Sequence, residues 1–145
     1  RAMAGMRIGF AMGNKKLIKY LNDAKFSFNS YTMNRPSLVL GVEAIKDREY
    51  FEATVQKIIA TRERVKKQLT ELGFTFPDSK TNFIFASHKT IPAKDIFEAL
   101  KEHDIYVRYW NKERLNNSLR ISIGTDEEMD KLVAFLTKYI DERVQ

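Results

Sequence analysis

One segment of the sequence carries a helical pattern long enough to constrain the rest of the fold. Between about residues 48 and 72, apolar side chains recur at steps of three and four, which places them on one face of an α-helix. They are Phe51, Val55, Ile58, Val65, Leu69 and Leu72. Gly73 follows the last of them and predicts the end of the helix. Arg62 interrupts the apolar stripe, so the pattern favours a long helix lying across a sheet over a coiled coil.

The second half of the chain supplies the strands of that sheet. Short runs that are apolar, or that alternate as β-strands do, occupy residues 74–76, 82–86, 105–109 and 119–123. Helices are predicted at residues 93–103 and after Thr125, which has the capping-box spacing to Glu128. The inward side chains of these helices are Ile96, Phe97, Leu100, Met129, Leu132, Val133, Leu136 and Ile140. We therefore expect an α+β layer, a small sheet with helices packed on one face.

The beginning of the chain is predicted to hold three further elements. Residues 7–12 suit a short buried strand, and residues 15–24 have the apolar pattern of a short helix. Residues 26–35 are polar and aromatic without a period, which predicts a loop. Pro36 is favoured in the first turn of a helix, which we expect to run to about Lys46.

The composition restricts the chemistry open to the chain. Its 145 residues suit one domain, and the absence of Cys excludes disulfides, thiol catalysis and Cys-rich zinc sites. His88 and His103 are isolated in the sequence, so we expect each at the surface near a turn and no metal site. No apolar run reaches the ~18 residues of a membrane span, and no secretory signal is visible. We therefore expect a cytoplasmic protein without a membrane partner.

The net charge of +6, from 25 Lys and Arg against 19 Asp and Glu, raises the question of a nucleic-acid partner. The densest basic cluster spans residues 61–67 of the long helix, where Glu63 lies four residues before Lys67, as in an ordinary solvated ion pair. No nucleic-acid-binding motif accompanies it, so we interpret it as a solvated helix face and expect no nucleic-acid partner. The acidic run at residues 126–128 is interpreted as a complement to a helix dipole rather than as a metal site.

Three arginines are harder to assign to the surface. Arg108 and Arg120 oppose the apolar side chains of their strands, and a hairpin centred near Arg114 would set them opposite each other on one face. Like charges in that position are unfavourable unless an anion lies near them. The alternative is two exposed arginines that each pair with a surface acid. Arg7 lies in an apolar segment, where a buried arginine would need an anionic partner.

Several motifs occur in an order and spacing that resemble one enzyme family. The chain begins Arg-Ala-Met-Ala-Gly-Met-Arg-Ile-Gly-Phe, and residues 119–125 read Leu-Arg-Ile-Ser-Ile-Gly-Thr before an acidic helix start. Between them lie Asn29-Ser30-Tyr31, Asn34-Arg35-Pro36-Ser37, Gly73-Phe74, Thr81-Asn82-Phe83-Ile84 and Val107-Arg108. Over its whole length the chain resembles the fold-type I, pyridoxal-phosphate-dependent aminotransferases, and within them the histidinol-phosphate aminotransferases.

The resemblance implies a domain organisation and a role for each of the three arginines. Residues 1–30 would be the end of the large cofactor-binding domain, and residues 31–145 would be the small C-terminal domain. Arg7 resembles the arginine that holds the phosphate of pyridoxal 5'-phosphate. Arg120 resembles the arginine that binds the substrate α-carboxylate, and Arg108 is placed to meet a second substrate anion, here a phosphate.

The resemblance also implies the activity of the complete protein. The Schiff-base lysine of the family would fall two positions before Arg1, so the chain is expected to be an inactive C-terminal fragment without a catalytic residue. The complete enzyme would be a homodimer that exchanges an amino group between histidinol phosphate and 2-oxoglutarate or glutamate, in histidine biosynthesis. The alternatives are an aromatic amino acid aminotransferase, a pyridoxal-phosphate decarboxylase of a phosphate-bearing substrate and, outside the enzymes, a basic interaction module.

Overall fold

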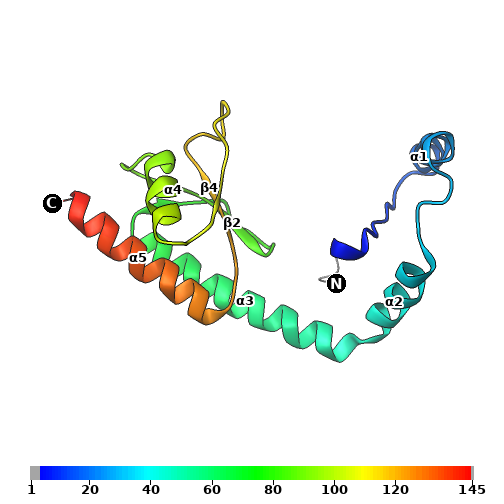
Figure 1. Cartoon of the computed structure of the whole chain (residues 1–145), viewed down its shortest axis with the longest axis horizontal. Coiled ribbons are helices and arrows are strands. Elements are labelled where there is room, and N and C mark those ends of the chain that lie inside the picture. Colours follow the sequence, from blue (N-terminus) through cyan, green and yellow to red (C-terminus); the bar gives the residue numbers. More distant parts are fainter. Residues whose placement is uncertain (1–3, 145) are drawn as a thin grey trace. The chain divides into compact units, whose positions relative to one another are not determined.

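The structure is a computed structural model and describes residues 4–144. Contacts divide the chain into two units, residues 1–53 and residues 54–145, which are described separately (Figure 1). The division falls within the long helix α3 (Arg48–Glu71), the helix that the apolar stripe predicts. The domain boundary predicted after residue 30 stays a prediction.

The first unit holds one short 3₁₀ turn and two helices. They are η1 (Ala4–Met6), α1 (Lys15–Phe28) and α2 (Arg35–Lys46). Both α-helices begin at an asparagine, because an Asn side chain accepts a hydrogen bond that the first turn cannot otherwise make. Oδ1 of Asn14 accepts from the N–H of Lys16 at 2.9 Å, and Oδ1 of Asn34 accepts from the N–H of Ser37 at 2.8 Å. Pro36 lies in the first turn of α2, as predicted.

Two predictions for this unit are wrong. Residues 7–12 form no strand within the described part of the chain. A strand needs a neighbour for its N–H and C=O groups, and the backbone of Arg7 is left-handed (φ +57°), which interrupts an extended run. The loop predicted for residues 26–35 begins later, because α1 continues to Phe28 and the N–H of Asn29 still donates into that helix at 2.8 Å.

The second unit is built on an antiparallel sheet with the strand order β1-β2-β4-β3. The strands are β1 (Phe74–Thr75), β2 (Phe83–His88), β3 (Arg108–Tyr109) and β4 (Leu119–Ser122). Each of the four predicted strand segments therefore contains a strand. The strand predicted for residues 105–109 is shorter than expected, since its first three residues form no ladder with β4.

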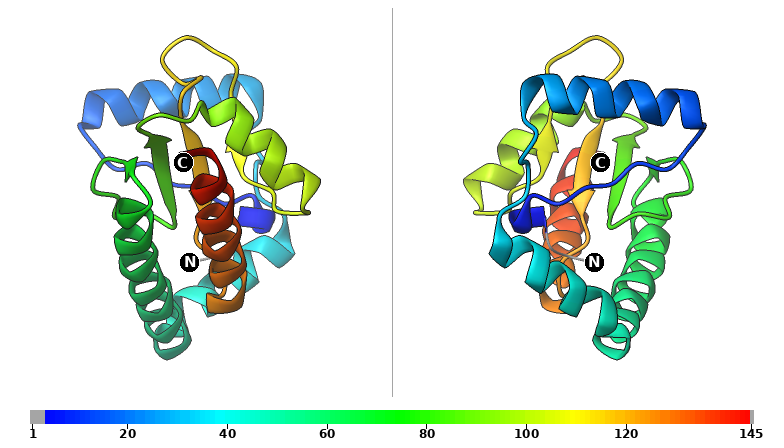
Figure 2. Two further views of the ribbon diagram at one scale, coloured as in Figure 1. Left: turned by 90° about the vertical axis from the view of Figure 1, so that its left-hand side faces the viewer. Right: turned by 90° about the vertical axis from the view of Figure 1, so that its right-hand side faces the viewer.

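Helices cover one face of this sheet. The second half of α3 packs there with α4 (Ala93–Glu102) and α5 (Asp126–Val144) (Figure 2). The largest fully buried side chains between helices and sheet are Val65, Leu69, Ile84, Ile96, Leu100, Leu119, Ile121, Leu132 and Leu136. Burial of each such side chain stabilises the fold by about 1.5–3 kcal/mol. This arrangement is the α+β layer that the sequence predicts.

Local signals fix the ends of two helices. Gly73 follows α3 with φ +84°, a conformation that glycine adopts without strain. At the start of α5, the N–H of Thr125 donates to Oε2 of Glu128 at 2.8 Å, and the N–H of Glu128 donates to Oγ1 of Thr125 at 3.3 Å. This confirms the predicted capping box. Gly124 makes room for it, because a Cβ at that position would collide with the carboxylate of Glu128.

His88 is buried, contrary to the surface position predicted for it. It is 4% exposed at the end of β2, and its ring meets the ring of Phe74 edge-on at 5.0 Å between centroids. Nε2 donates to the carbonyl of Leu72 at 2.9 Å, and Nδ1 accepts from the N–H of Ile91 at 3.0 Å. These backbone partners, which no sequence pattern reveals, allow a neutral histidine in the core. Burial lowers the pKa of His88.

Candidate anion-binding site

Arg108 and Arg120 occupy the face of the sheet that the helices leave free. They are direct cross-strand partners in the β3–β4 ladder, which confirms the predicted register. Phe85 of β2 is the partner of Arg120 on its other side. Directly opposed residues in such a ladder have Cβ atoms about 4.5–5.5 Å apart, so the two arginine side chains start close together. Leu119 and Ile121, on either side of Arg120, point into the core.

Aromatic rings flank the two guanidinium groups. The guanidinium carbon of Arg120 lies 5.3 Å from the ring centroid of Phe83 and 5.5 Å from that of Trp110. The guanidinium carbon of Arg108 lies 5.4 Å from the centroid of the same Trp110 ring. All three distances are within the ~6 Å range of a cation–π interaction. The ring of Trp110 also packs against Phe85, 6.4 Å between centroids.

Neither Arg108 nor Arg120 forms an ion pair with an acid in the described part of the chain, so the alternative of two arginines paired with surface acids is not observed. Nε of Arg120 is buried and has no hydrogen-bond partner among residues 4–144. A buried donor on a charged group destabilises the fold unless an acceptor reaches it. Guanidinium groups on two directly opposed residues are suited to bidentate binding of a carboxylate or a phosphate.

Arg7 belongs to the first unit and is exposed, contrary to the burial predicted for it. One of its terminal nitrogens donates to the carbonyl of Ala4 at 3.3 Å, and the neighbouring Ile8 is 38% exposed. Within the first unit this apolar segment meets only part of α2, where Ile8 lies close to Gly41 and Oγ of Ser37 donates to the carbonyl of Met6 at 3.2 Å. The side chain of Arg7 therefore stays exposed. The remaining N–H groups of Arg7 are available to an anion.

The basic cluster of α3 is neutralised by acids of the same unit. Arg64 pairs with Asp126 at 2.8 Å, and Lys66 pairs with Asp78 at 2.5 Å. The hydrogen bond from Lys66, with a smaller contribution from Lys80, lowers the pKa of Asp78 to about 2. The hydrogen bond from Arg64 likewise lowers the pKa of Asp126. These pairs leave little of the cluster's charge for a nucleic acid.

Part of this cluster is not the solvated helix face that the sequence predicts. Arg62 is only 5% exposed, and its terminal nitrogen donates to the carbonyl of Thr81 at 2.9 Å. Its Nε donates to Glu63 at 3.0 Å. Glu63 pairs with Lys66 at 3.0 Å rather than, within the described residues, with Lys67 as predicted. The cluster therefore joins α3 to the loop before β2.

The acidic run at the start of α5 has structural partners. Oγ1 of Thr61 donates to Oδ1 of Asp126 at 2.9 Å, and Arg64 donates to the same oxygen. Within residues 4–144, no group of three His, Cys, Asp or Glu side chains is arranged to hold a metal ion. Asp126 thus ties α5 to α3.

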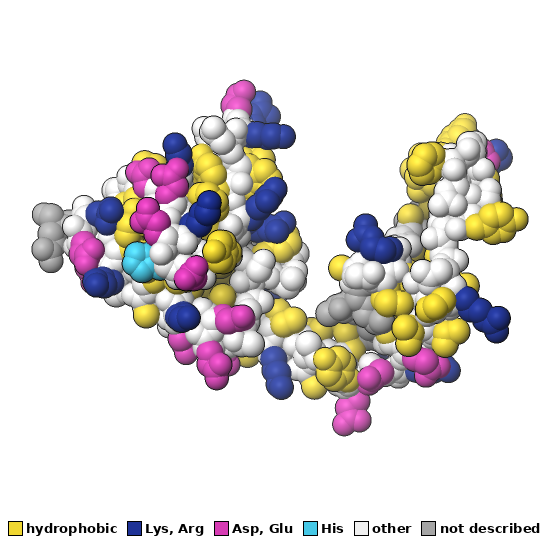
Figure 3. Space-filling view, in the orientation of Figure 1, with side chains coloured by type: hydrophobic (Ala, Val, Ile, Leu, Met, Phe, Trp, Pro, Cys, Tyr) yellow, Lys and Arg dark blue, Asp and Glu magenta, His cyan; other side chains and the backbone are white. Residues whose placement is uncertain are grey.

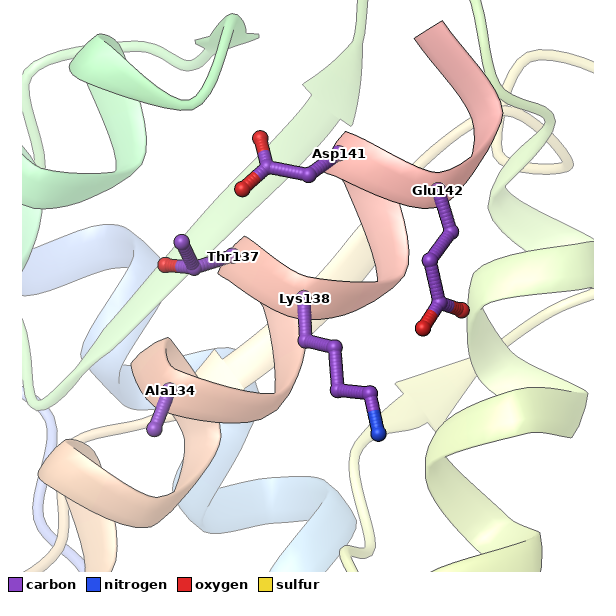
Figure 4. A pocket seen from close by; sticks show the side chains of 5 residues that line it. All are labelled: Ala134, Thr137, Lys138, Asp141 and Glu142. Atoms are coloured by element: carbon purple, nitrogen blue, oxygen red, sulfur yellow. The ribbon is translucent and has the colours of Figure 1, made fainter. Parts of the chain in front are cut away.

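One further depression on the surface lacks the walls of a ligand site. A shallow depression on α5 is lined by Ala134, Thr137, Lys138, Asp141 and Glu142, and Figure 4 shows that all five come from that one helix. It therefore has no second wall that could enclose a ligand. None of the described helices is both long enough and apolar enough to cross a membrane.

Sequence reasoning missed the two aromatic residues that contact the arginines. Trp110 follows Arg108 by two positions, so strand alternation could have placed both on one face. Phe83 lies on β2, far from either arginine in the sequence, and only the β2–β4 pairing brings it close. No local pattern could have identified Phe83.

Comparison with known proteins shows the family of the chain. The sequence model of the family described as aminotransferase class I and II matches residues 1–136. The chain belongs to this family. The histidinol-phosphate aminotransferase of Brachyspira hyodysenteriae is 55% identical over 140 residues, which are 97% of this chain and 39% of that protein. The enzyme of the same name from Clostridium botulinum (strain Okra) is 50% identical over 142 residues, 98% of this chain and 40% of that protein.

A solved structure of the family agrees with the fold. The histidinol-phosphate aminotransferase from Sinorhizobium meliloti in complex with pyridoxal-5'-phosphate is 26% identical and superposes with a TM-score of 0.76. The match covers 97% of this chain and 38% of that one. The chain thus spans about two fifths of the length of these class I and II aminotransferases. Both the family resemblance and the fold class predicted from the sequence are confirmed.

Proposed function

We propose that this chain is the C-terminal part of an aminotransferase that exchanges an amino group between histidinol phosphate and 2-oxoglutarate or glutamate. The main observation behind this proposal is the opposed pair of Arg108 and Arg120. Neither guanidinium pairs with an acid among the described residues, and the buried Nε of Arg120 has no partner there, so this face offers a site for an anion. Identities of 55% and 50% to proteins named histidinol-phosphate aminotransferase support the choice of substrate.

The chemistry of the two substrates explains why two arginines serve better than one. Histidinol phosphate carries its phosphate on the carbon next to the amino-bearing carbon, and glutamate carries its α-carboxylate at that place. Both anions must therefore bind at one position if the amino group is to reach the same reacting atom. In this proposal Arg120 binds the carboxylate, and Arg108 adds the second positive charge that a phosphate of charge close to −2 requires.

The cofactor of this reaction would be pyridoxal 5'-phosphate. When bound, it supplies the carbonyl that takes up the amino group and the conjugated ring that withdraws electrons. The exposed guanidinium of Arg7, bonded within the described residues only to the carbonyl of Ala4, fits a cation that holds the cofactor phosphate. The three arginines would thus bind and orient, and we assign no catalytic residue within residues 1–145.

We further propose that the complete enzyme is a cytoplasmic homodimer whose other ligands are small molecules. The first unit supports a longer protein, because apolar side chains of α1 and α2 are exposed in it (Figure 3). Leu17, Phe28 and Ile45 are 63%, 94% and 68% exposed. Apolar surface of this extent is typical of faces that other parts of a protein cover.

The test uses a protein in which this chain is extended upstream to the length of its relatives. After addition of pyridoxal 5'-phosphate, we expect a visible absorbance band and formation of glutamate from histidinol phosphate and 2-oxoglutarate. Absence of both would contradict the proposal and leave the basic interaction module. Faster turnover of phenylalanine than of histidinol phosphate would favour the aromatic aminotransferase. Release of carbon dioxide from an amino acid that carries both a carboxylate and a phosphate would favour the decarboxylase.

A further inference from the structure

Trp110 lies against both arginines of the anion site. Its ring centroid is 5.4 Å from the guanidinium carbon of Arg108 and 5.5 Å from that of Arg120. We propose that Trp110 is a positioning residue, whose ring holds the two guanidinium groups in the one arrangement that binds a tetrahedral phosphate. The nature of the anion rests on the proposed function, whereas the role of the ring rests on the geometry alone.

The repulsion between the two arginines is the reason a holding group is needed. Arg108 and Arg120 are directly opposed, and no acid among the described residues pairs with either of them. Without a ligand, long flexible side chains of like charge would therefore turn away from each other. The negative face of an indole ring attracts both cations without neutralising them. Trp110 can thus hold Arg108 and Arg120 near each other and leave the full charge of both available to an anion.

The two arginines do not depend on Trp110 to the same extent. Arg120 is also 5.3 Å from the ring of Phe83, and its Nε is buried. Arg108 is exposed, and Trp110 is the one ring that it contacts within the described residues. Loss of the indole should therefore release Arg108 and leave Arg120 held by Phe83. The effect of a Trp110 variant should resemble the effect of Arg108→Ala more than that of Arg120→Ala.

Two substitutions distinguish the effect of the aromatic face of Trp110 from the effect of its apolar volume. Trp110→Phe keeps an aromatic face, and Trp110→Leu keeps apolar volume without one, so neither leaves a large cavity. Tyr106→Leu is the matched control, because Tyr106 is an exposed aromatic residue (73%) two positions before Arg108. Its hydroxyl donates to Asp104 at 3.4 Å, whereas the ring against Arg108 is that of Trp110. Thermal unfolding of each variant reports any general loss of structure.

The experiment measures the dissociation constant of inorganic phosphate, and KM and kcat for histidinol phosphate, in the protein extended to the length of its relatives. We expect Trp110→Leu to raise both the phosphate dissociation constant and KM by about tenfold, with little change in kcat. Trp110→Phe should restore most of the loss, and Tyr106→Leu should behave as the wild type. In the background Arg108→Ala, Trp110→Leu should add almost nothing.

Two results would overturn the inference. One is unchanged phosphate affinity in Trp110→Leu, and the other is an equal loss in Trp110→Leu and Trp110→Phe, which would assign the effect to packing. These outcomes differ from a failure of the proposed function. If phosphate binding depends on Trp110 while histidinol phosphate is not a substrate, the function is wrong and the role of the ring stands.

Discussion

Arg108 and Arg120 face each other across adjacent antiparallel strands, and both guanidinium groups lie within 5.5 Å of the ring centroid of Trp110. Such a pair is unfavourable for the fold alone, because the like charges repel and Nε of Arg120 has no partner among the described residues. The pair is explained by a ligand that brings negative charge to this face. The two arginines therefore lower the stability of the fold at this site, and in exchange they allow it to bind an anion.

Inorganic phosphate should stabilise the wild-type protein more than the variant Arg108→Gln. A ligand that binds only the folded state raises the free energy of unfolding, by about 1.4 kcal/mol at ten times its dissociation constant. Removal of one of the two cations weakens the binding and reduces this gain. The measurement is the thermal unfolding midpoint with and without phosphate, with sodium chloride at matched ionic strength as the control. An equal rise in both proteins would contradict a site built from both arginines.

Gly124→Ala should destabilise α5 by about 0.5–2 kcal/mol, the range of a lost helix cap. A Cβ at Gly124 would displace the carboxylate of Glu128 from the N–H of Thr125. Chemical denaturation gives the change in the free energy of unfolding. Glu128→Ala alone should cost a similar amount. Because both changes break one interaction, the double variant should cost little more than either, and additive costs would show that the cap is not what Gly124 protects.

The stability of the second unit should fall as the pH is lowered through about 6.5. Burial lowers the pKa of His88 below its ordinary value of 6.5, so the unfolded chain takes up a proton that the folded chain excludes. Stability is therefore complete above 6.5 and declines between that value and the lower pKa of the folded state. His88→Gln should flatten this part of the pH profile. His103→Gln is the control for the loss of a histidine side chain, because His103 is exposed.

The carboxyl group of Asp78 should titrate near 2, well below its ordinary value of 3.8. Since the hydrogen bond from Lys66 is the largest cause, Lys66→Met should return the pKa most of the way to 3.8. Lys80→Met should have a smaller effect. The measurement is an NMR titration of the Asp78 side chain. A larger effect of Lys80 would show that Lys66 is not the main partner.

The opposed arginines were predictable from the sequence because two local features, the alternation of a strand and the length of a connection, determine their positions. Strand alternation sets Arg108 and Arg120 apart from the apolar face, and the length of the connection about Arg114 sets the register. The end of α3 at Gly73 and the start of α5 at Thr125 were predictable for a similar reason, since each depends only on neighbours in the chain.

The errors concern residues whose positions depend on partners that no sequence pattern identifies. His88 is buried because the carbonyl of Leu72 and the N–H of Ile91 meet its ring, and neither partner has a sequence signature. The apolar run at residues 7–12 fits a strand, yet the described part of the first unit contains no strand with which it could pair. Phe83 reaches Arg120 only through the pairing of β2 with β4.

The most direct measurement compares kcat/KM for two amino donors in the protein extended to the length of its relatives. Arg108→Ala should lower kcat/KM for histidinol phosphate by about 10–100-fold, the loss of a charge-assisted hydrogen bond. It should lower kcat/KM for phenylalanine much less, because the single carboxylate of phenylalanine stays with Arg120. Arg120→Ala should impair both. Equal losses for the two donors in Arg108→Ala would contradict the assignment of this arginine pair to a phosphate-bearing substrate.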